Sequence, residues 1–421
     1  MKNAPKVVQE AHARAEAAQP GGELSVEHAG ARNSDLRHRN LALVFQQVLA
    51  ADQPPSRAVI AALTGLTRST VSRLVDELIA GNLLRELDAV GTGRAGRPAL
   101  PLRPSGKGLV ALGMELNVNH LSVLAMDLAG DVIASRDRLA DHTGTNPEEG
   151  FVRLAGLARE VLDEVGGRRL AGVGVAVPGL VSVKRGLLLR APNLGWREVP
   201  VAEILRTDLK LSDSTPVVVG NEADQAAISV AMPAPGVHNG LRDFFYISGE
   251  VGIGGAAVVA EEILDGAHGW AGEIGHTPVF PEGRLCGCGA RGCLEAYAGA
   301  TALCRMSDAE DIDAVAAAAR SGSQAALQVL SEAGRALGIA LSGAINLLDL
   351  PSVVLGGHLA SLLEWIEPAT RQELAERVLS YEFSPTQITT VDQPERPAAL
   401  GSAVRAFQSV IERPDRWLLA R

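Results

Sequence analysis

The chain has 421 residues, of which 47% are hydrophobic and 21% are charged, a composition typical of a globular protein with a large core. This length predicts two or three domains, and no uninterrupted apolar run approaches the length of a membrane span. The start of the chain, Met1 to Lys6, does not resemble a signal peptide, so we expect a cytoplasmic protein without membrane contact.

The formal net charge of −10 is unevenly distributed along the chain. Between Leu36 and Lys107 there are ten Lys and Arg residues but five Asp and Glu residues, so this segment carries +5 and the remainder −15. A basic segment on an acidic chain is typical of a nucleic-acid-binding module joined to a domain with a different task.

Residues 1–35 are rich in Ala, Gly, Glu and Gln with little apolar periodicity, so we predict a disordered tail. Three helices are predicted to follow it. The first has an apolar face between Leu41 and Val48. The second begins after Ser56, and the third begins after Thr67, because both residues are good helix caps, and Gly65 supplies the turn between them.

The third helix has the pattern of a helix-turn-helix recognition helix. Its apolar stripe faces inward, while polar residues near its N-terminus are placed to contact base edges and phosphates of double-stranded DNA: Arg68, Ser69, Thr70, Ser72 and Arg73. An ordinary three-helix bundle with solvated polar residues is the alternative. We assign residues 36–90 to this DNA-binding domain.

A wing strand is predicted at residues 83–87, and residues 91–107 are predicted to form a wing and linker. Glycine and proline hold this segment extended and narrow, and Arg94 and Arg97 suit insertion into an A·T-rich minor groove. A flexible linker with incidental arginines is the alternative interpretation.

From Gly108 onward, β-type runs alternate with helical segments, which predicts an α/β architecture. A helix is expected near residues 148–165. Strands are expected at residues 109–115, 121–127, 132–134, 172–177, 217–219, 244–248 and 352–357. We divide this part into one lobe at residues 108–220 and a second lobe at residues 221–421, and we expect the C-terminal helix to return to the first lobe.

Three of the four cysteines, Cys286, Cys288 and Cys293, lie within eight residues, and His276 precedes them. Cys and His at short, glycine-rich spacing supply the ligands of a closed tetrahedral Zn²⁺ site. A disulfide scaffold is the alternative, but four cysteines in 421 residues without a secretory signal argue against it. Four protein ligands leave no open position, so the zinc is expected to be structural.

These motifs together resemble the ROK family of repressors, uncharacterised open reading frames and sugar kinases. The resemblance covers nearly the whole chain from Leu36 onward. It is most specific in the Gly-rich turn at 249–255 that leads to Ala271–His276, in the Cys-Gly-Cys-Gly-x-x-Gly-Cys-x-Glu motif ending at Glu295, and at Asn221. It implies a two-lobed, actin-like (ribonuclease-H-type) sugar-kinase-like domain. The added winged helix-turn-helix resembles the xylose and N-acetylglucosamine repressor branch of the family.

The resemblance also implies which residues bind sugar hydroxyls in the cleft between the lobes: Asn193, Asn221, Glu222, Glu273, His276 and Glu295. Carboxylates and amides suit this task because they form several directional hydrogen bonds to vicinal hydroxyls. Exposed polar side chains without a ligand are the alternative for each of them. Zinc would fix the loop that carries Glu273 and Glu295, and His276 would contact both the metal and the sugar.

The segments that a sugar kinase of this family needs are altered. The expected Asp-x-Gly-x-Thr phosphate turn reads Glu115-Leu116-Asn117-Val118-Asn119, and Glu222 stands at the position of the catalytic Asp. The additional methylene displaces the carboxylate by roughly an ångström, which costs about 10²-fold in rate where positioning matters. Glu250, in the second Gly-rich turn, would repel a triphosphate. We therefore expect no catalytic residues and no enzymatic activity.

The leading hypothesis is a sugar-responsive DNA-binding transcriptional regulator, specifically a repressor of carbohydrate metabolism. The effector would shift the closure of the two lobes. A homodimer or homotetramer on a palindromic operator is expected, because two half-sites add affinity. The alternatives are an active sugar kinase that also binds DNA and a DNA-binding scaffold with a vestigial cleft.

Overall fold

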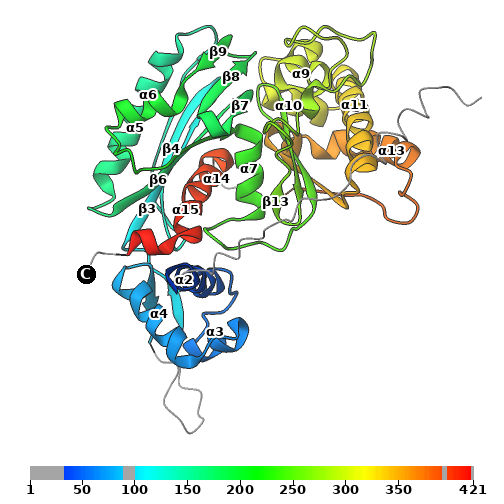
Figure 1. The fold of residues 1–421 in the computed structure, drawn as a ribbon. Helices are drawn as coiled ribbons and strands as arrows, with labels where there is room; N and C mark the ends of the chain where they lie inside the picture. Colours follow the sequence, from blue (N-terminus) through cyan, green and yellow to red (C-terminus); the bar gives the residue numbers. More distant parts are fainter. Residues whose placement is uncertain (1–32, 89–99, 391–395, 419–421) are drawn as a thin grey trace, which may run out of the picture. The chain divides into compact units, whose positions relative to one another are not determined.

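The computed structural model describes residues 33–88, 100–390 and 396–418 (Figure 1). The chain divides into two compact units, residues 1–39 and residues 40–421. The predicted tail at 1–35 lies almost entirely outside the described residues, as do Arg94 and Arg97 of the predicted wing. Among the described residues, no helix has the length and apolar character that crossing a membrane requires.

The N-terminal helices are α2 (Asn33–Leu49), α3 (Arg57–Thr64) and α4 (Arg68–Ala80), which confirms the three predicted helices. The Ser56 hydroxyl accepts a hydrogen bond from the N–H of Val59 and so caps α3. The Thr67 hydroxyl caps α4 in the same way, and Gly65 ends α3 with a φ of 71°. The apolar residues of the three helices are buried together: Leu41, Val44, Phe45, Ile60, Val71, Leu74, Val75 and Leu78.

A two-stranded wing follows α4. It pairs β1 (Leu84–Glu86) with β2 (Leu102–Pro104) in antiparallel register. The second strand lies inside residues 91–107, which we predicted as wing and linker without placing a strand there. Three residues are too short for a visible alternating pattern, and the signal that places them is tertiary, because Leu102 is fully buried in the apolar core.

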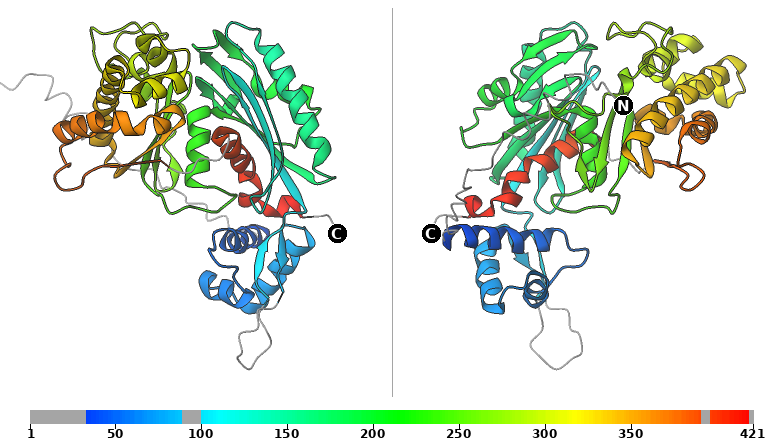
Figure 2. Two further views of the ribbon diagram at one scale, coloured as in Figure 1. Left: turned by 180° about the vertical axis from the view of Figure 1, so that it is seen from behind. Right: turned by 45° about the vertical axis from the view of Figure 1, so that its right-hand side comes forward.

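The first lobe is built on a five-stranded sheet in the order β10-β6-β3-β4-β5. Its strands β6 and β10 run parallel to β3, and β3, β4 and β5 form an antiparallel meander. Helices α5 (Pro147–Glu164) and α6 (Val201–Asp208) cover one face, and α14 (Pro397–Ala406) covers the other (Figures 1 and 2). The strands are β3 (Leu109–Leu116), β4 (His120–Asp127), β5 (Val132–Leu139), β6 (Arg169–Val177) and β10 (Val217–Asn221).

A small antiparallel sheet completes this lobe with β7 (Leu180–Ser182), β8 (Leu187–Ala191) and β9 (Trp196–Val199), and the short helix η1 (Val183–Arg185) connects its first two strands. The strand β5 extends five residues beyond its predicted end. Its outer half carries exposed charged residues at an edge of the sheet, and such an edge strand lacks the apolar alternation that marks a strand in the sequence.

The second lobe contains another five-stranded sheet, in the order β13-β12-β11-β14-β15. Helix α7 (Glu222–Ala231) packs on one face of this sheet, and the apolar cluster on the other face includes helices α8 to α11 (Figure 1). The strands are β11 (Phe244–Gly249), β12 (Ile253–Val259), β13 (Glu262–Ile263), β14 (Ser352–Gly356) and β15 (Gln387–Thr390). The remaining helices are η2 (Ile274–His276), α8 (Glu295–Ala298), α9 (Ala300–Ser307), α10 (Ile312–Arg320), α11 (Gln324–Leu348), α12 (Gly357–Ser361), α13 (Leu363–Arg377), α15 (Gln408–Glu412) and η3 (Pro414–Trp417).

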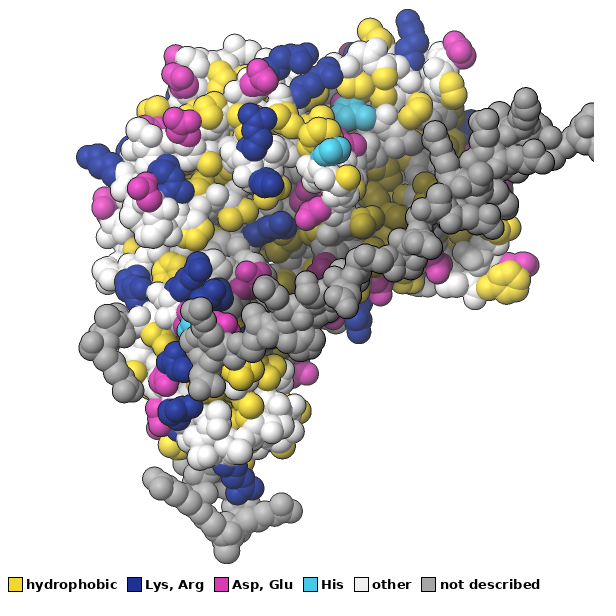
Figure 3. Space-filling view, in the orientation of Figure 1, with side chains coloured by type: hydrophobic (Ala, Val, Ile, Leu, Met, Phe, Trp, Pro, Cys, Tyr) yellow, Lys and Arg dark blue, Asp and Glu magenta, His cyan; other side chains and the backbone are white. Residues whose placement is uncertain are grey.

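Basic and acidic side chains are mixed over the described residues on the face shown in Figure 3. The two lobes therefore present no single-sign charged patch on that face.

Helix α14 packs against the first-lobe sheet and against α7 at distances that only glycine allows. A Cβ atom at Gly113 would overlap the carbonyl oxygen of Ala399, and one at Gly401 would overlap the carbonyl oxygen of Gln225 in α7. Because both obstacles are backbone atoms, they cannot move aside by changing a rotamer. Glycine at these positions is therefore a packing requirement.

We expect Gly401→Ala to lower the free energy of unfolding by about 2 kcal/mol, because overpacking outweighs the gain in helix propensity. The measurement is the urea midpoint of the full chain. Gly343→Ala in α11 is the matched control. Nothing lies within 4 Å of a Cβ at Gly343, so that variant should gain about 0.5–1 kcal/mol. Equal midpoints for the two variants would contradict the packing argument.

Candidate functional site

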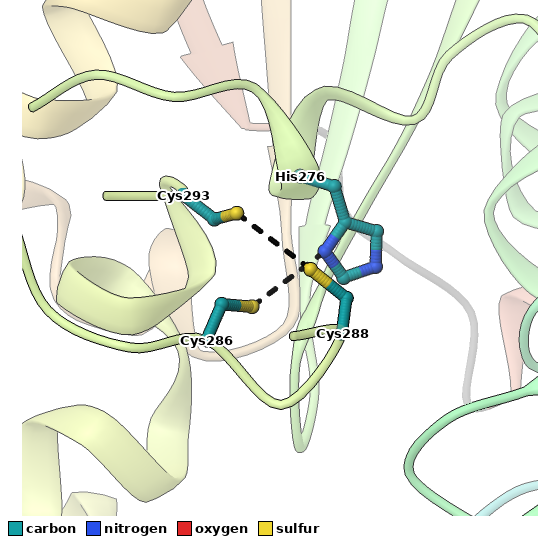
Figure 4. A group of neighbouring side chains, drawn as sticks. All are labelled: His276, Cys286, Cys288 and Cys293. Atoms are coloured by element: carbon teal, nitrogen blue, oxygen red, sulfur yellow. Dashed lines mark hydrogen bonds between the residues drawn. The ribbon is translucent and has the colours of Figure 1, made fainter. Parts of the chain in front are cut away.

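Four potential metal ligands converge in the second lobe. Their ligand atoms all lie within 4.8 Å of one another: His276, Cys286, Cys288 and Cys293 (Figure 4). The Sγ atoms of Cys288 and Cys293 are 3.8 Å apart, and Cys286 Sγ lies 3.8 Å from His276 Nδ1. A tetrahedral site with Zn–S bonds of about 2.3 Å has S···S edges of about 3.8 Å. The group could therefore hold a metal ion.

Glycines set the backbone of this loop. Gly289 and Gly292 have φ values of 98° and 74°, which side chains rarely permit. The N–H of Gly289 donates to the carbonyl of Cys286, and the N–H of Cys286 donates to the carbonyl of Ala290. The bridge between Pro278 and Cys293 brings the segment after His276 beside the last cysteine. Local turns thus bring all four side chains together.

Glu295 connects this loop to the Gly-rich turn. Its Oε2 accepts a hydrogen bond of 3.1 Å from the N–H of Ile253, and its Oε1 lies 3.7 Å from Cys286 Sγ. A Cβ atom at Gly252 would overlap Glu295 Oε2 and would lie 3.1 Å from Asn193 Nδ2. Asn193 comes from the first lobe, so the structure brings Asn193 and Glu295 to the same place.

Asn221 and Glu273 line a small cavity together with Gly179 and Asp224. Its volume is about 20 Å³, which holds about one water molecule. Asn221 already makes several hydrogen bonds there. Its Oδ1 caps α7 by accepting from the N–H of Ala223, and its Nδ2 donates to the carbonyl of Gly179 at 3.0 Å.

Glu222 does not line this small cavity. It lines a larger cavity of about 170 Å³ with Glu115, His120 and Glu250. Gly254 lines both cavities, so they lie side by side. The six residues implied as a sugar site are thus distributed over three neighbouring places: the metal cluster with Glu295 and Asn193, the small cavity, and the carboxylate-lined cavity.

Asp224 is a site residue that the sequence analysis missed. The pKa of its carboxyl is raised to about 7, mainly by burial and then by the carboxylate of Asp265, while Arg405 opposes the shift. In the sequence, an acidic residue three positions after an Asn helix cap is more often part of the cap than of a ligand site. A buried acid with a pKa near neutrality is a functional-site candidate.

We expect the titration of Asp224 to lower the stability of the protein as the pH rises from about 4 to about 7. The pKa of Asp224 is higher in the folded chain than its ordinary value of 3.8, so the folded state binds more protons across that window. A shift of this size corresponds to at most about 4 kcal/mol. The stability of the Asp224→Asn variant should therefore depend less on pH. At pH 8 this variant should melt at a higher temperature than the wild type.

The measurement is the melting temperature between pH 5 and pH 8. Asp213→Asn, at an exposed position, is the control and should follow the wild-type curve. A wild-type pH profile in Asp224→Asn would show that the carboxyl titrates with its ordinary pKa.

The predicted DNA-binding residues of the third helix all lie in the first half of α4. Arg68, Ser69 and Arg73 are exposed, whereas Thr70 and Ser72 are half-buried. The hydroxyls of Ser69 and Thr70 lie 3.0 and 2.9 Å from the Thr67 hydroxyl, within hydrogen-bond distance of the residue that caps the helix. The two arginines are therefore the strongest candidates for contacts outside the protein.

The fold and the site define a class of protein, in which a winged helix-turn-helix is joined to a two-lobed sugar-kinase-like domain with a Cys₃His cluster beside its cleft. The chain belongs to the ROK family, whose model matches residues 111–408. Residues 42–88 match the IclR helix-turn-helix domain.

Individual relatives include both regulators and enzymes. A xylose repressor from Caldicellulosiruptor bescii is 25% identical over 404 residues, which cover 90% of this chain and 98% of the relative. A glucokinase from Halalkalibacterium halodurans is 29% identical over 272 residues, which cover 58% and 79%. A solved structure described as a ROK family transcriptional regulator, homolog of the E. coli MLC protein, has a TM-score of 0.74 at 23% identity and covers 90% of this chain and 97% of its own. The last likeness shows the fold.

Proposed function

We propose that the protein is a sugar-responsive DNA-binding repressor of carbohydrate metabolism and that it has no kinase activity. The observation that carries this proposal is the combination, in one chain, of a helix-turn-helix and a sugar-kinase-like cleft with altered catalytic positions. The similarity to a xylose repressor over nearly the full length of both chains supports the same conclusion.

The altered positions argue against phosphoryl transfer on physical grounds. Asn117 is buried in the first turn, where its Oδ1 accepts from the N–H of Val118 and its Nδ2 donates to Glu115. Its side chain occupies the turn at which the kinase pattern has a glycine that admits phosphate to the backbone. Three carboxyl groups line the adjoining cavity, so a triphosphate would meet negative charge there.

The Cys₃His cluster suits structural Zn²⁺. Three thiolates and one imidazole are ligands that zinc prefers, and four protein ligands leave no position for a reacting water. His276 Nδ1 faces the sulfur atoms, and its Nε2 lies on the far side of the ring (Figure 4). The metal would hold the loop that carries Glu273 and would keep Glu295 beside the cleft. A cytoplasmic location suits these thiols, because reducing conditions keep them free.

The residues that would bind the sugar together are dispersed in this structure, which suits an effector that acts through lobe movement. They are Asn193, Asn221, Glu222, Glu273, His276 and Glu295. Trp270 Nε1 donates to the carbonyl of Val181, and Arg190 donates to the carbonyl of Cys288, so hydrogen bonds join the two lobes. A sugar could shift the balance between closed and open lobes through its differential affinity for them. A homodimer or homotetramer on a palindromic operator would double the DNA contacts.

The test combines a gel-shift titration with an ATP-consumption assay on the same protein. DNA fragments selected by the full-length protein are titrated in the presence of xylose, glucose, glucosamine or N-acetylglucosamine. We expect one of these sugars to change the DNA affinity at least tenfold and none to support ATP consumption. ATP consumption with any of the sugars would show that the protein is a kinase. A DNA affinity that none of the four sugars changes would contradict the sensor function.

A further inference from the structure

The cavity of about 170 Å³ beside Glu222 has no role in the proposed sugar site apart from that residue. Both lobes contribute to it. Glu115 and Asn117 come from the end of β3, His120 begins β4, Glu222 begins α7, and Glu250 follows β11. It lies where a kinase of this fold would place phosphate groups, but its side chains are of the wrong charge for them.

Three carboxyl groups crowd this cavity. Burial raises the pKa of Glu222 well above its ordinary value, and the nearby carboxylates of Glu115 and Glu250 raise it further. The pKa of Glu250 is also raised, by burial and then by Glu115. A positively charged group in the cavity would relieve this mutual repulsion between carboxylates.

Glu222 supplies an independent sign of a ligand site. Its Oε2 is buried and has no hydrogen-bond partner among the described residues, although the residue lines the cavity. A buried acceptor without a donor is unfavourable, because folding has removed it from water without replacing the lost hydrogen bond, and the penalty is larger when the acceptor is charged. A donor placed in the cavity would recover this free energy.

The cationic side chains around the cavity are already paired with other groups. His120 Nε2 lies 3.3 Å from Glu115 Oε1, and its Nδ1 lies 2.8 Å from Asn119 Oδ1. Arg396 forms an ion pair with Asp137 at the rim of the cavity. Neither of them is a hydrogen-bond partner of Glu222 Oε2. Among the described residues, the Glu250 side chain has no hydrogen bond or ion pair either, so both carboxyl groups are available to a ligand.

The charge and spacing of the carboxyl groups in the cavity indicate the chemistry of the ligand that would fit there. Phosphate is excluded because it would add negative charge to three carboxyl groups. A directly ligated divalent ion is disfavoured by spacing. In the part of the chain that the structure describes, the Cys₃His cluster is the one group of three or more His, Cys, Asp or Glu side chains placed to hold a metal ion. An ammonium group, with three N–H donors that each reach an oxygen at about 2.8 Å, suits more widely separated carboxylates.

We propose that this cavity binds the protonated primary amine of a small organic molecule through Glu222 and Glu250. The amine could belong to the effector itself, as in an amino sugar that extends from the small cavity past Gly254, and this form of the proposal rests on the proposed sugar-sensing function. It could equally belong to a separate small amine. The chemistry recognised is the same, and the experiment separates the two sources.

The experiment is a calorimetric titration of the full-length protein at pH 7 and constant ionic strength with four ligands: glucosamine, glucose, putrescine and magnesium chloride. We expect an amine to bind at least tenfold more tightly than its neutral counterpart, and Glu250→Gln to remove at least tenfold of that affinity. Glu310→Gln, at an exposed position outside the cavity, is the matched control and should bind like the wild type. Melting temperature and metal content are measured for Glu250→Gln and for Glu115→Gln. Wild-type values show that the substitution has not unfolded the site.

Each outcome has one meaning. Glucosamine bound above glucose identifies the effector as the source of the amine, and putrescine binding identifies a separate amine. Absence of amine binding, equal affinity in Glu250→Gln, or a magnesium affinity that depends on Glu250 overturns the inference. Sugar-dependent DNA binding without any amine preference would leave the proposed function intact, whereas putrescine binding without any sugar effect on DNA would leave only the inference.

A pH series with putrescine gives a second readout. Affinity should rise between pH 6 and pH 8, because Glu222 and Glu250, whose pKa values are raised, lose protons in that direction. The pKa of His120 is raised too, and loss of its proton strengthens the same trend. Among the described residues, Arg396, paired with Asp137, is the other basic residue that lines the cavity.

Discussion

Replacing Cys293 with serine is expected to lower the melting temperature of the second lobe by more than about 10 °C and to abolish the response of DNA binding to sugar. Cys293 is fully buried, and a hydroxyl is a poor ligand for zinc. Structural Zn²⁺ contributes about 10–16 kcal/mol in zinc-finger peptides. A loss of about 4 kcal/mol would already shift the melting temperature by roughly 10 °C in a lobe of this size.

The measurement is a thermal melt combined with metal analysis of the purified protein. A strong chelator added to the wild type should reproduce the melt of the variant. Cys304→Ser is the matched control, because Cys304 lies in α9 outside the cluster. If Cys293→Ser keeps a stoichiometric metal and the wild-type melting temperature, the cluster is not a metal site.

Replacing both Arg68 and Arg73 with alanine is expected to weaken binding to a selected DNA fragment at least 100-fold. Each arginine that reaches DNA is worth about 1–3 kcal/mol, and each occurs twice in a dimer. The logarithm of the affinity should also fall less steeply with the logarithm of salt concentration, by about one unit for each phosphate that an arginine no longer neutralises. Sugar binding should not change, because both residues lie in α4.

Fluorescence anisotropy with the selected fragment and with a scrambled fragment, at several salt concentrations, tests this expectation. Arg305→Ala in α9 removes one positive charge from an exposed position of the second lobe and should bind DNA like the wild type. Wild-type affinity and salt dependence in the double variant would show that α4 does not face DNA.

The features that the sequence predicted well are those whose cause is local. Ser56, Gly65 and Thr67 fix the ends of two helices through hydrogen bonds and backbone angles within a few residues. The Cys₃His cluster could be predicted from the sequence because three of its ligands lie in one turn and glycines allow that turn to close. Short-range patterns determine both.

The features that escaped prediction depend on the packing of distant segments. Glu115, Glu222 and Glu250 come from three separate elements, so nothing in their spacing indicates a common cavity. The split of the implied sugar residues between neighbouring cavities has the same origin, because it depends on how two sheets and α7 meet. Likewise, the close approach of α14 to Gly113 joins segments almost 300 residues apart.

The small volume of the cavity between Gly179, Asn221 and Glu273 has a kinetic consequence. A monosaccharide is far larger than the single water molecule that this cavity holds, so it can enter only after the lobes have separated. Association would be gated by this opening, and its rate would level off at high sugar concentration instead of rising in proportion to it. The speed of the regulatory response would be set by the protein and not by the supply of sugar.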